Sequence, residues 1–195
     1  MTTKSLILAS SSPRRKELLQ TLGLSFTVQT SDVEEDTKPG LSPREIVEEL
    51  ALRKAVAVAS RLTEGIVLGS DTIVVLDGQV LGKPADEAEA CRMLKSLQGR
   101  EHMVYSGVAV VDASTGRREV SSSRTEVRFA PMTDREIAAY VATGEPMDKA
   151  GSYAIQGIGA AFVEGIAGDY FTVVGLPLRL TATMLSRFGV EVLQV

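Results

Sequence analysis

Hydroxyl groups and positive charges are concentrated in one short segment near the start of the chain, Ala9-Ser10-Ser11-Ser12-Pro13-Arg14-Arg15-Lys16. It follows the apolar run Leu6–Ala9, and its Ser-Pro pair is typical of a helix start. The cations then fall in the first helical turn, where they oppose the helix dipole, and a bound anion would reverse that cost. The segment indicates either a phosphate site, with Ser10 among its hydrogen-bond donors, or a capped helix followed by solvated basic residues.

Two places in the sequence offer carboxylates for catalysis or metal binding. Asp71 lies in Gly69-Ser70-Asp71-Thr72, between two apolar runs. We expect it to be at least partly buried and to meet a cation, a metal or a hydrogen-bond donor, unless it is a turn aspartate bonded to its own backbone. The run Glu34-Glu35-Asp36 supplies oxygen ligands suited to Mg²⁺ or Mn²⁺, although a solvated acidic loop is the more frequent meaning of such a run.

Further candidates are two lysines and one glutamine. Lys54 falls four residues after Leu50, on the apolar face of a predicted helix, so its ammonium group either reaches along the surface or points into a cleft. Lys83, in Leu81-Gly82-Lys83-Pro84, follows a predicted hairpin strand and is equally compatible with a surface lysine. Gln156 lies in the glycine-bracketed segment 148–157, where its amide offers a donor and an acceptor to a base edge; a glycine-rich turn explains the same pattern.

Composition excludes several classes of function. The 195 residues carry a net charge of −4, which disfavours bulk nucleic-acid binding, so an anionic ligand needs a local cationic cluster. No apolar run is long enough for a membrane helix, and Met1–Leu8 lacks the features of a signal peptide. The single cysteine fits a reducing compartment. With only one histidine, His102, the sequence disfavours a zinc site of nitrogen and sulfur ligands, and His102 is interpreted as structural or surface.

The elements that position these residues alternate between strands and amphipathic helices, which predicts an α/β fold with a mixed sheet flanked by helices. Helices are expected after Ser12, after the capping box at 42–45, after Asp86, after Thr133 and from 176–177 to about Gly189. Strands are expected at 6–9, 66–68, 73–76, 80–81, 104–111 and 119–129, with a hairpin turn at 77–78. Two more are expected at 160–163 and 171–174, around a turn at 164–165.

Each motif is weak alone, but their set and order closely resemble the Maf family over nearly the whole chain. The matching segments are 9–15, Gly69-Ser70-Asp71-Thr72, Gly82-Lys83-Pro84, 148–157 and Val174-Gly175-Leu176-Pro177. The resemblance implies a single domain over 1–195, with an elongated mixed sheet and two lobes around a nucleotide cleft, related to inosine triphosphate pyrophosphatases. It also implies a cytoplasmic, metal-dependent nucleotide pyrophosphatase, usually a homodimer.

The resemblance further implies roles for individual residues. Asp71 is carried over as the proton acceptor, and Arg14, Thr72 and Gln156 match the branch that prefers dTTP and UTP. A second branch, which prefers 7-methyl-GTP, has Trp, Gln and Glu at these three positions.

The chemistry of the residues agrees with that implication. Four cations would oppose a triphosphate, namely Arg14, Arg15, Lys54 and Lys83. Mg²⁺ or Mn²⁺ held by Asp71 with Glu34 or Glu35 would polarise the α-phosphorus, and pyrophosphate would leave.

Two other classes of function remain open on the sequence. A nucleotide-binding regulator of cell division or septum formation would use the same cationic residues, but it would gain nothing from an intact Asp71 without a metal. An interaction protein with solvated charges would explain the strands and caps, but not three cations in one first helical turn.

Overall fold

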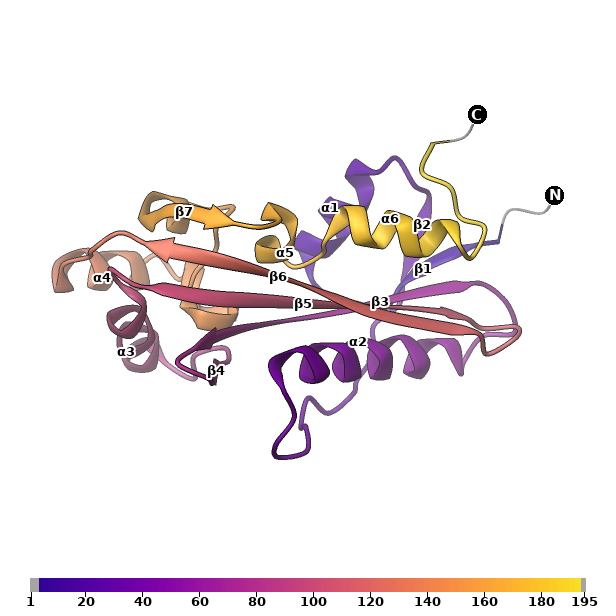
Figure 1. Cartoon of the computed structure of the whole chain (residues 1–195), viewed down its shortest axis with the longest axis horizontal. Helices are drawn as coiled ribbons and strands as arrows, with labels where there is room; N and C mark the ends of the chain where they lie inside the picture. The colour runs from indigo at the N-terminus through magenta and orange to yellow at the C-terminus, as the bar shows by residue number, and fades with distance from the viewer. Residues whose placement is uncertain (1–3, 194–195) are drawn as a thin grey trace. The chain divides into compact units, whose positions relative to one another are not determined.

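The structure is a computed structural model that describes residues 4–193 (Figure 1). The expectation of no signal peptide in Met1–Leu8 therefore falls partly on residues 1–3, outside the described residues. None of the helices within 4–193 has the length and apolar character needed to cross a membrane. The helices are α1 (Pro13–Thr21), α2 (Pro43–Ala59), α3 (Glu87–Leu97), α4 (Asp134–Val141), α5 (Tyr170–Val174) and α6 (Leu178–Ser186), with three short 3₁₀ helices at Glu145–Asp148, Ala150–Ser152 and Ile158–Phe162.

Seven strands form one mixed sheet, as the sequence predicted. They are β1 (Leu6–Leu8), β2 (Phe26–Val28), β3 (Ile66–Leu76), β4 (Gln79–Leu81), β5 (Glu101–Asp112), β6 (Arg118–Phe129) and β7 (Val163–Ala167). Their order is β2-β1-β3-β5-β6-β7, and β4 pairs with β3. β1 is parallel to β2 and β3, whereas β4 is antiparallel to β3 and β7 is antiparallel to β6.

The chain forms two compact units, and three long strands contribute residues to both of them. Unit 1 comprises residues up to Asp71, Ser106–Ser123 and the chain from Gly175, and unit 2 comprises Thr72–Tyr105 and Arg124–Val174. β3, β5 and β6 each contribute one part to each unit. In unit 1, α2 covers one face of the sheet, and α1 and α6 lie on the other (Figure 1).

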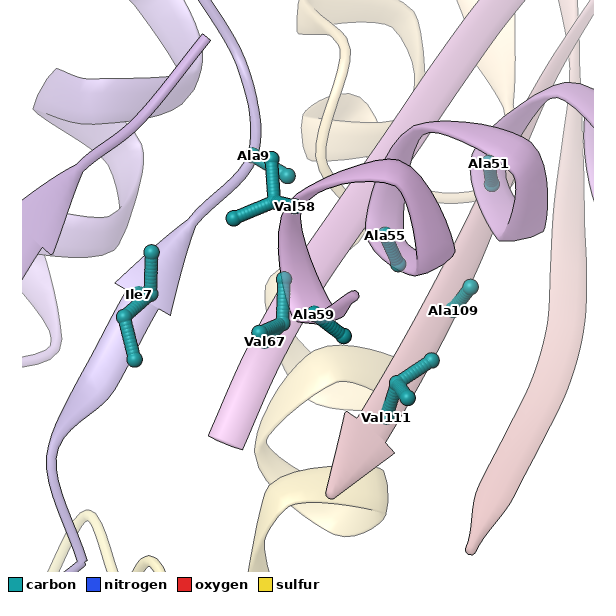
Figure 2. Close-up of a cluster of buried hydrophobic side chains, with 9 residues drawn as sticks. All are labelled: Ile7, Ala9, Ala51, Ala55, Val58, Ala59, Val67, Ala109 and Val111. Atoms are coloured by element: carbon teal, nitrogen blue, oxygen red, sulfur yellow. The ribbon is translucent and has the colours of Figure 1, made fainter. Parts of the chain in front are cut away.

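Small side chains bring α2 unusually close to the sheet of unit 1. Its inward face presents Ala51, Ala55 and Ala59, which pack with apolar residues of β1, β3 and β5 (Figure 2). A Cβ atom added at Gly69 of β3 would lie 2.9 Å from the backbone nitrogen of Ala55, and one at Gly107 of β5 would lie 3.0 Å from that of Glu48. Glycine is therefore required at both positions by backbone-to-backbone proximity rather than by turn geometry.

In unit 2, α3 and α4 pack against each other, and an aromatic cluster forms part of the core. His102 contacts Phe129 and Tyr153 edge to face, and its Nε2 atom lies 2.7 Å from the Tyr153 hydroxyl. His102 is only 3% exposed, so the structural interpretation of this residue is confirmed.

The predicted helix starts are confirmed, and two strand predictions are wrong. The strands expected at 66–68 and 73–76 are confirmed as parts of one longer strand, β3, which continues through 69–72, where all residues except half-buried Thr72 are buried. Residues 160–163 are mostly 3₁₀ helix, and the strand comes later, at 163–167, over the expected turn. Residues 171–174 form α5, because the Asp169 carboxylate accepts hydrogen bonds from the backbone N–H and hydroxyl of Thr172 and so starts a helical turn.

The contact between α2 and Gly69 gives a direct test of this packing. In Gly69→Ala the new methyl group overlaps the backbone of α2, so we expect a loss of about 2 kcal/mol or more in the free energy of unfolding, as for other overpacked cores. Gly165→Ala is the matched control, because nothing lies within 4 Å of a Cβ atom there. Urea unfolding of both variants measures the effect; equal stability of the two would contradict the close approach.

The burial of His102 gives a pH prediction. Burial lowers the pKa of His102 from 6.5 to about 4, so the imidazole is neutral in the folded protein. Below pH 6.5 the unfolded chain binds a proton that the folded protein does not, so His102 costs stability progressively as pH falls, about 3 kcal/mol in all by pH 4.

The measurement is the difference in unfolding free energy between wild type and His102→Gln from pH 7 to pH 4. Glu45 and Glu136, whose pKa values are lowered by hydrogen bonds at helix caps, also weaken the fold in acid, but they do so equally in both proteins. Parallel pH profiles for the two proteins would show that His102 does not titrate as described.

Candidate functional site

Arg15 is folded back over the start of α1 and does not extend into solvent. Ser12 caps the helix through a hydrogen bond from the Arg15 backbone N–H to its hydroxyl. The Arg15 side chain donates from Nε to the Gly175 carbonyl at 2.9 Å and from Nη1 to the Ser10 hydroxyl at 3.4 Å. Ser10 is only 7% exposed and also accepts from the Ser12 backbone N–H at 3.2 Å. The start of α1 is thus a built cluster of one guanidinium and two hydroxyls, with half-buried Arg14 next to it.

The carbonyl of Gly175, just before α6, ties this cluster to β3. It accepts from the buried hydroxyl of Ser70 at 3.1 Å as well as from Arg15. The sequence analysis did not identify this role, because a backbone acceptor leaves no side-chain signal. Two buried donors sharing one carbonyl fix the guanidinium of Arg15 relative to the strand that carries Asp71.

Lys54 joins two of the carboxylates that the sequence analysis singled out, Asp71 and Glu35. Its Nζ atom lies 2.6 Å from Asp71 Oδ1 and 2.8 Å from Glu35 Oε1. The side chains of Lys54 and Asp71 are 12% and 9% exposed, whereas that of Glu35 is 59% exposed. The predicted burial of Asp71 and its need for a cation are confirmed. The ammonium group of Lys54 points inward to Asp71 rather than along the surface of the protein.

The charges of this cluster affect one another. Burial lowers the pKa of the Arg15 guanidinium, the negative charge of Asp71 raises it in opposition, Arg14 lowers it and Glu35 raises it. Arginine nevertheless stays protonated in proteins. Unit 1 therefore places two cations, Arg15 and Lys54, near the buried carboxylate of Asp71, and Arg14 lies close to Arg15.

Two carboxylates meeting on one nitrogen form a donor set that fits Mg²⁺ or Mn²⁺. Both ions prefer oxygen ligands, and Mg²⁺ is usually held by one or two carboxylates together with substrate phosphates. Within residues 4–193 no group of three or more His, Cys, Asp or Glu is arranged to hold a metal on its own. Glu34, the alternative ligand, is exposed, and its backbone carbonyl accepts a hydrogen bond from Arg53 at 2.6 Å.

Side chains alternate between the two faces of β3, so neighbouring residues of the motif 69–72 make different contacts. Gly69 and Asp71 face α2, and Ser70 faces the Gly175 carbonyl on the opposite side. Thr72 has the same parity as Ser70. This geometry could not be predicted from a segment interpreted as a break between two strands.

The other candidates belong to unit 2. Lys83 and Gln156 are exposed, and Thr72 is half-buried. The backbone N–H of Gly151 donates to the Gly82 carbonyl at 3.1 Å, which joins the loop before Lys83 to the 3₁₀ turn that precedes Gln156. Gly151 has a φ of +69°, and a Cβ atom there would lie 2.9 Å from Val74 Cγ2, so this turn requires glycine.

Comparison with known proteins places the chain in a family. Residues 5–188 match the family described as Maf-like protein, and the chain therefore belongs to the Maf-like proteins.

Several relatives of this chain are named dTTP/UTP pyrophosphatase. A protein of Pelotomaculum thermopropionicum named dTTP/UTP pyrophosphatase is 55% identical over 97% of this chain and all of its own length. Equally named proteins of Moorella thermoacetica and Symbiobacterium thermophilum are each 57% identical, over 96% and 94% of both chains respectively. Among solved structures, the Staphylococcus aureus Ham1 protein is similar over 65% of this chain and 72% of its own, with a TM-score of 0.49 and 19% identity.

The shared ion pair predicts unequal effects of removing either partner. Lys54→Met removes the cation that directly contacts the buried Asp71 carboxylate, and we expect a loss of about 3 kcal/mol in the free energy of unfolding. Asp71→Asn removes the buried charge and leaves Lys54 paired with Glu35, so we expect a change within about 1 kcal/mol. Urea unfolding at pH 7.5 compares the two, and equal losses would contradict the assignment of Asp71 as the buried member.

Proposed function

We propose that this protein hydrolyses dTTP and UTP, or modified pyrimidine nucleotides of the same kind, to the monophosphate and pyrophosphate. The observation that carries the proposal is the identity of 54–57% over nearly full length with relatives named dTTP/UTP pyrophosphatase. The cluster in unit 1 supplies a chemical reason, because its cations offset the charge of a triphosphate and its buried carboxylate can accept a proton.

In the proposed mechanism, the residues of unit 1 bind the phosphates and take up one proton. Arg14 and Arg15 oppose the phosphate charges, and Ser10 hydrogen-bonds a phosphate oxygen. Lys54 holds Asp71 by one carboxylate oxygen, Oδ1, and the carboxylate accepts the proton of the attacking water. The water oxygen forms a bond to the α-phosphorus, the bond from that phosphorus to the bridging oxygen breaks, and pyrophosphate leaves. Lys83 is proposed as a further cation for the leaving group.

A divalent cation belongs to this proposal. Asp71 and Glu35 would hold Mg²⁺ or Mn²⁺ jointly with the nucleotide, with Glu34 as the predicted alternative ligand. When bound, the ion polarises the α-phosphoryl group and neutralises developing charge. Lys54 contacts one oxygen of each carboxylate, so it would hold the two side chains together as ligands of the ion, and its positive charge would also oppose the charge of the phosphates.

Base selection is assigned to three positions that vary between the branches of the family. Gln156 pairs with a pyrimidine edge through its amide oxygen and amide nitrogen, with Thr72 and Arg14 completing the selection. We regard the two compact units as the two lobes of one domain spanning 1–195. A homodimer in the cytoplasm, acting on nucleotides, is the setting proposed for this activity.

The products of the reaction in H₂¹⁸O test the proposal. With dTTP and Mg²⁺ we expect dTMP and pyrophosphate, with the ¹⁸O label in dTMP, because water attacks the α-phosphorus. Asp71→Asn should lower kcat by about 10²-fold or more while staying folded, as expected for the loss of a general base. Label in pyrophosphate, or formation of dTDP and orthophosphate, would exclude this mechanism, and near-normal kcat in Asp71→Asn would remove Asp71 as the base.

A further inference from the structure

The segment that carries Gln156 is held at its exit by the carboxylate of Glu145 and at its entrance by a phenol that is hydrogen-bonded to the same carboxylate. Glu145 begins the first 3₁₀ helix, at Glu145–Asp148. Its Oε1 atom accepts from the backbone N–H of Ile158 at 2.9 Å, and its Oε2 atom accepts from that of Gly159 at 3.0 Å. These two donors follow Gln156 by two and three residues, so they fix the exit of the segment.

The entrance is fixed through Tyr140. The hydroxyl of Tyr140 donates to Glu145 Oε2 at 2.6 Å and accepts from the backbone N–H of Ala154 at 3.1 Å. Tyr140 belongs to α4 and is only 2% exposed, so the anchor is part of the core of unit 2. One carboxylate and one phenol therefore hold residues 154–159, and we call this pair the Glu145–Tyr140 clamp.

The fit of the clamp is tight enough to require glycine. A Cβ atom at Gly157 would overlap Glu145 Oε1, and one at Gly159 would lie 2.7 Å from both the Tyr140 hydroxyl and the Ala154 carbonyl. Burial raises the pKa of Glu145, but the hydrogen bonds from Tyr140, Gly159 and Ile158 outweigh it, so the pKa lies below its usual value. The clamp thus contains an ionised carboxylate with three donors directed at its two oxygens.

Between the two fixed ends of the segment, the side chain of Gln156 is exposed to solvent. Ile155 is buried at 9% exposure, whereas Gln156 is exposed. A Gln amide distinguishes bases only if its oxygen and nitrogen are held in register with the base edge, and displacements near 1 Å are costly. A hydrogen-bonded carboxylate fixes direction, which apolar packing of an exposed loop would not.

We propose that Glu145 is a positioning residue for nucleotide selection, which acts through the Glu145–Tyr140 clamp to hold Gln156 in register with the base. The inference rests on the proposed function. It makes Glu145 and Tyr140 determinants of selectivity in addition to Arg14, Thr72 and Gln156, the three positions to which base selection is assigned above.

Glu145→Gln is a sharp test because no orientation of the amide satisfies all donors. If its nitrogen replaces Oε1, the N–H of Ile158 loses its acceptor, and if it replaces Oε2, that of Gly159 does. We expect the ratio of kcat/KM for dTTP to that for dGTP to fall by about tenfold, mostly through a higher KM for dTTP. The kcat for dTTP should change by less than about threefold, because the residues of unit 1 are untouched.

Three further variants complete the design. Tyr140→Phe removes the link to Ala154 and should lower the same ratio in the same direction, which covers a failure of Glu145→Gln to fold. Glu164→Gln changes an exposed carboxylate of β7 in the same unit and should leave the ratio unchanged. Gln156→Ala measures the selectivity that the clamp is proposed to support.

Amide hydrogen exchange gives a readout that does not depend on activity. Exchange at residues 158–159 should become faster in Glu145→Gln but not in Glu164→Gln.

The outcomes separate the two proposals. Wild-type protein that releases no pyrophosphate from dTTP overturns the proposed function and this inference with it. An active wild type with reduced selectivity in Gln156→Ala, but unchanged ratios in Glu145→Gln and Tyr140→Phe, overturns the inference alone. An equal loss of kcat/KM for both nucleotides assigns Glu145 a purely structural role, and unchanged selectivity in Gln156→Ala removes the residue that the clamp is said to position.

Discussion

The close approach of α2 to β3 is the constraint on which the candidate site depends. Gly69 lets the backbone of the helix come within van der Waals distance of the strand, and the small residues Ala51 and Ala55 fill the interface. Lys54 follows in the same helix and Asp71 in the same strand, so their short contact results from this packing. A larger residue at 69 would separate a buried carboxylate from its cation, and an unpaired charge of this kind is expensive.

The same cluster reconciles an acidic protein with an anionic substrate. The net charge of −4 is spread over the chain, whereas Arg14, Arg15 and Lys54 are gathered around the start of α1 and the middle of β3. Asp71 and Glu35 partly neutralise these cations, which lets them lie close together without a ligand. A triphosphate with a divalent ion would exchange partners within this set: the phosphates take the cations, and the ion takes the carboxylates.

Sequence reasoning identified the elements with local signals and failed where tertiary packing decides. Ser12, Ser42 and Thr133 cap helices as predicted, because capping depends on residues three positions apart. The continuity of β3 through 69–72 was missed, because glycine, serine and aspartate are typical of turns. Only the tertiary structure shows that α2 packs against Gly69 and that Ser70 donates to the Gly175 carbonyl. Glu145 was missed for the same reason: its donors lie 13 and 14 residues away, and only the fold brings them together.

The two units fix their functional side chains by different means, and the difference follows from what each must do. Unit 1 pairs charges directly, so removing Lys54, one of the cations proposed to bind phosphate, also takes a contacting cation away from the buried Asp71 carboxylate. Unit 2 fixes backbone instead: the Glu145–Tyr140 clamp holds backbone N–H groups on both sides of Gln156, whose side chain is exposed. A side chain held through its backbone can be replaced without disturbing its support. If Gln156 selects the base as proposed, a fold with this division can change the selected base at that position while it keeps one phosphate chemistry.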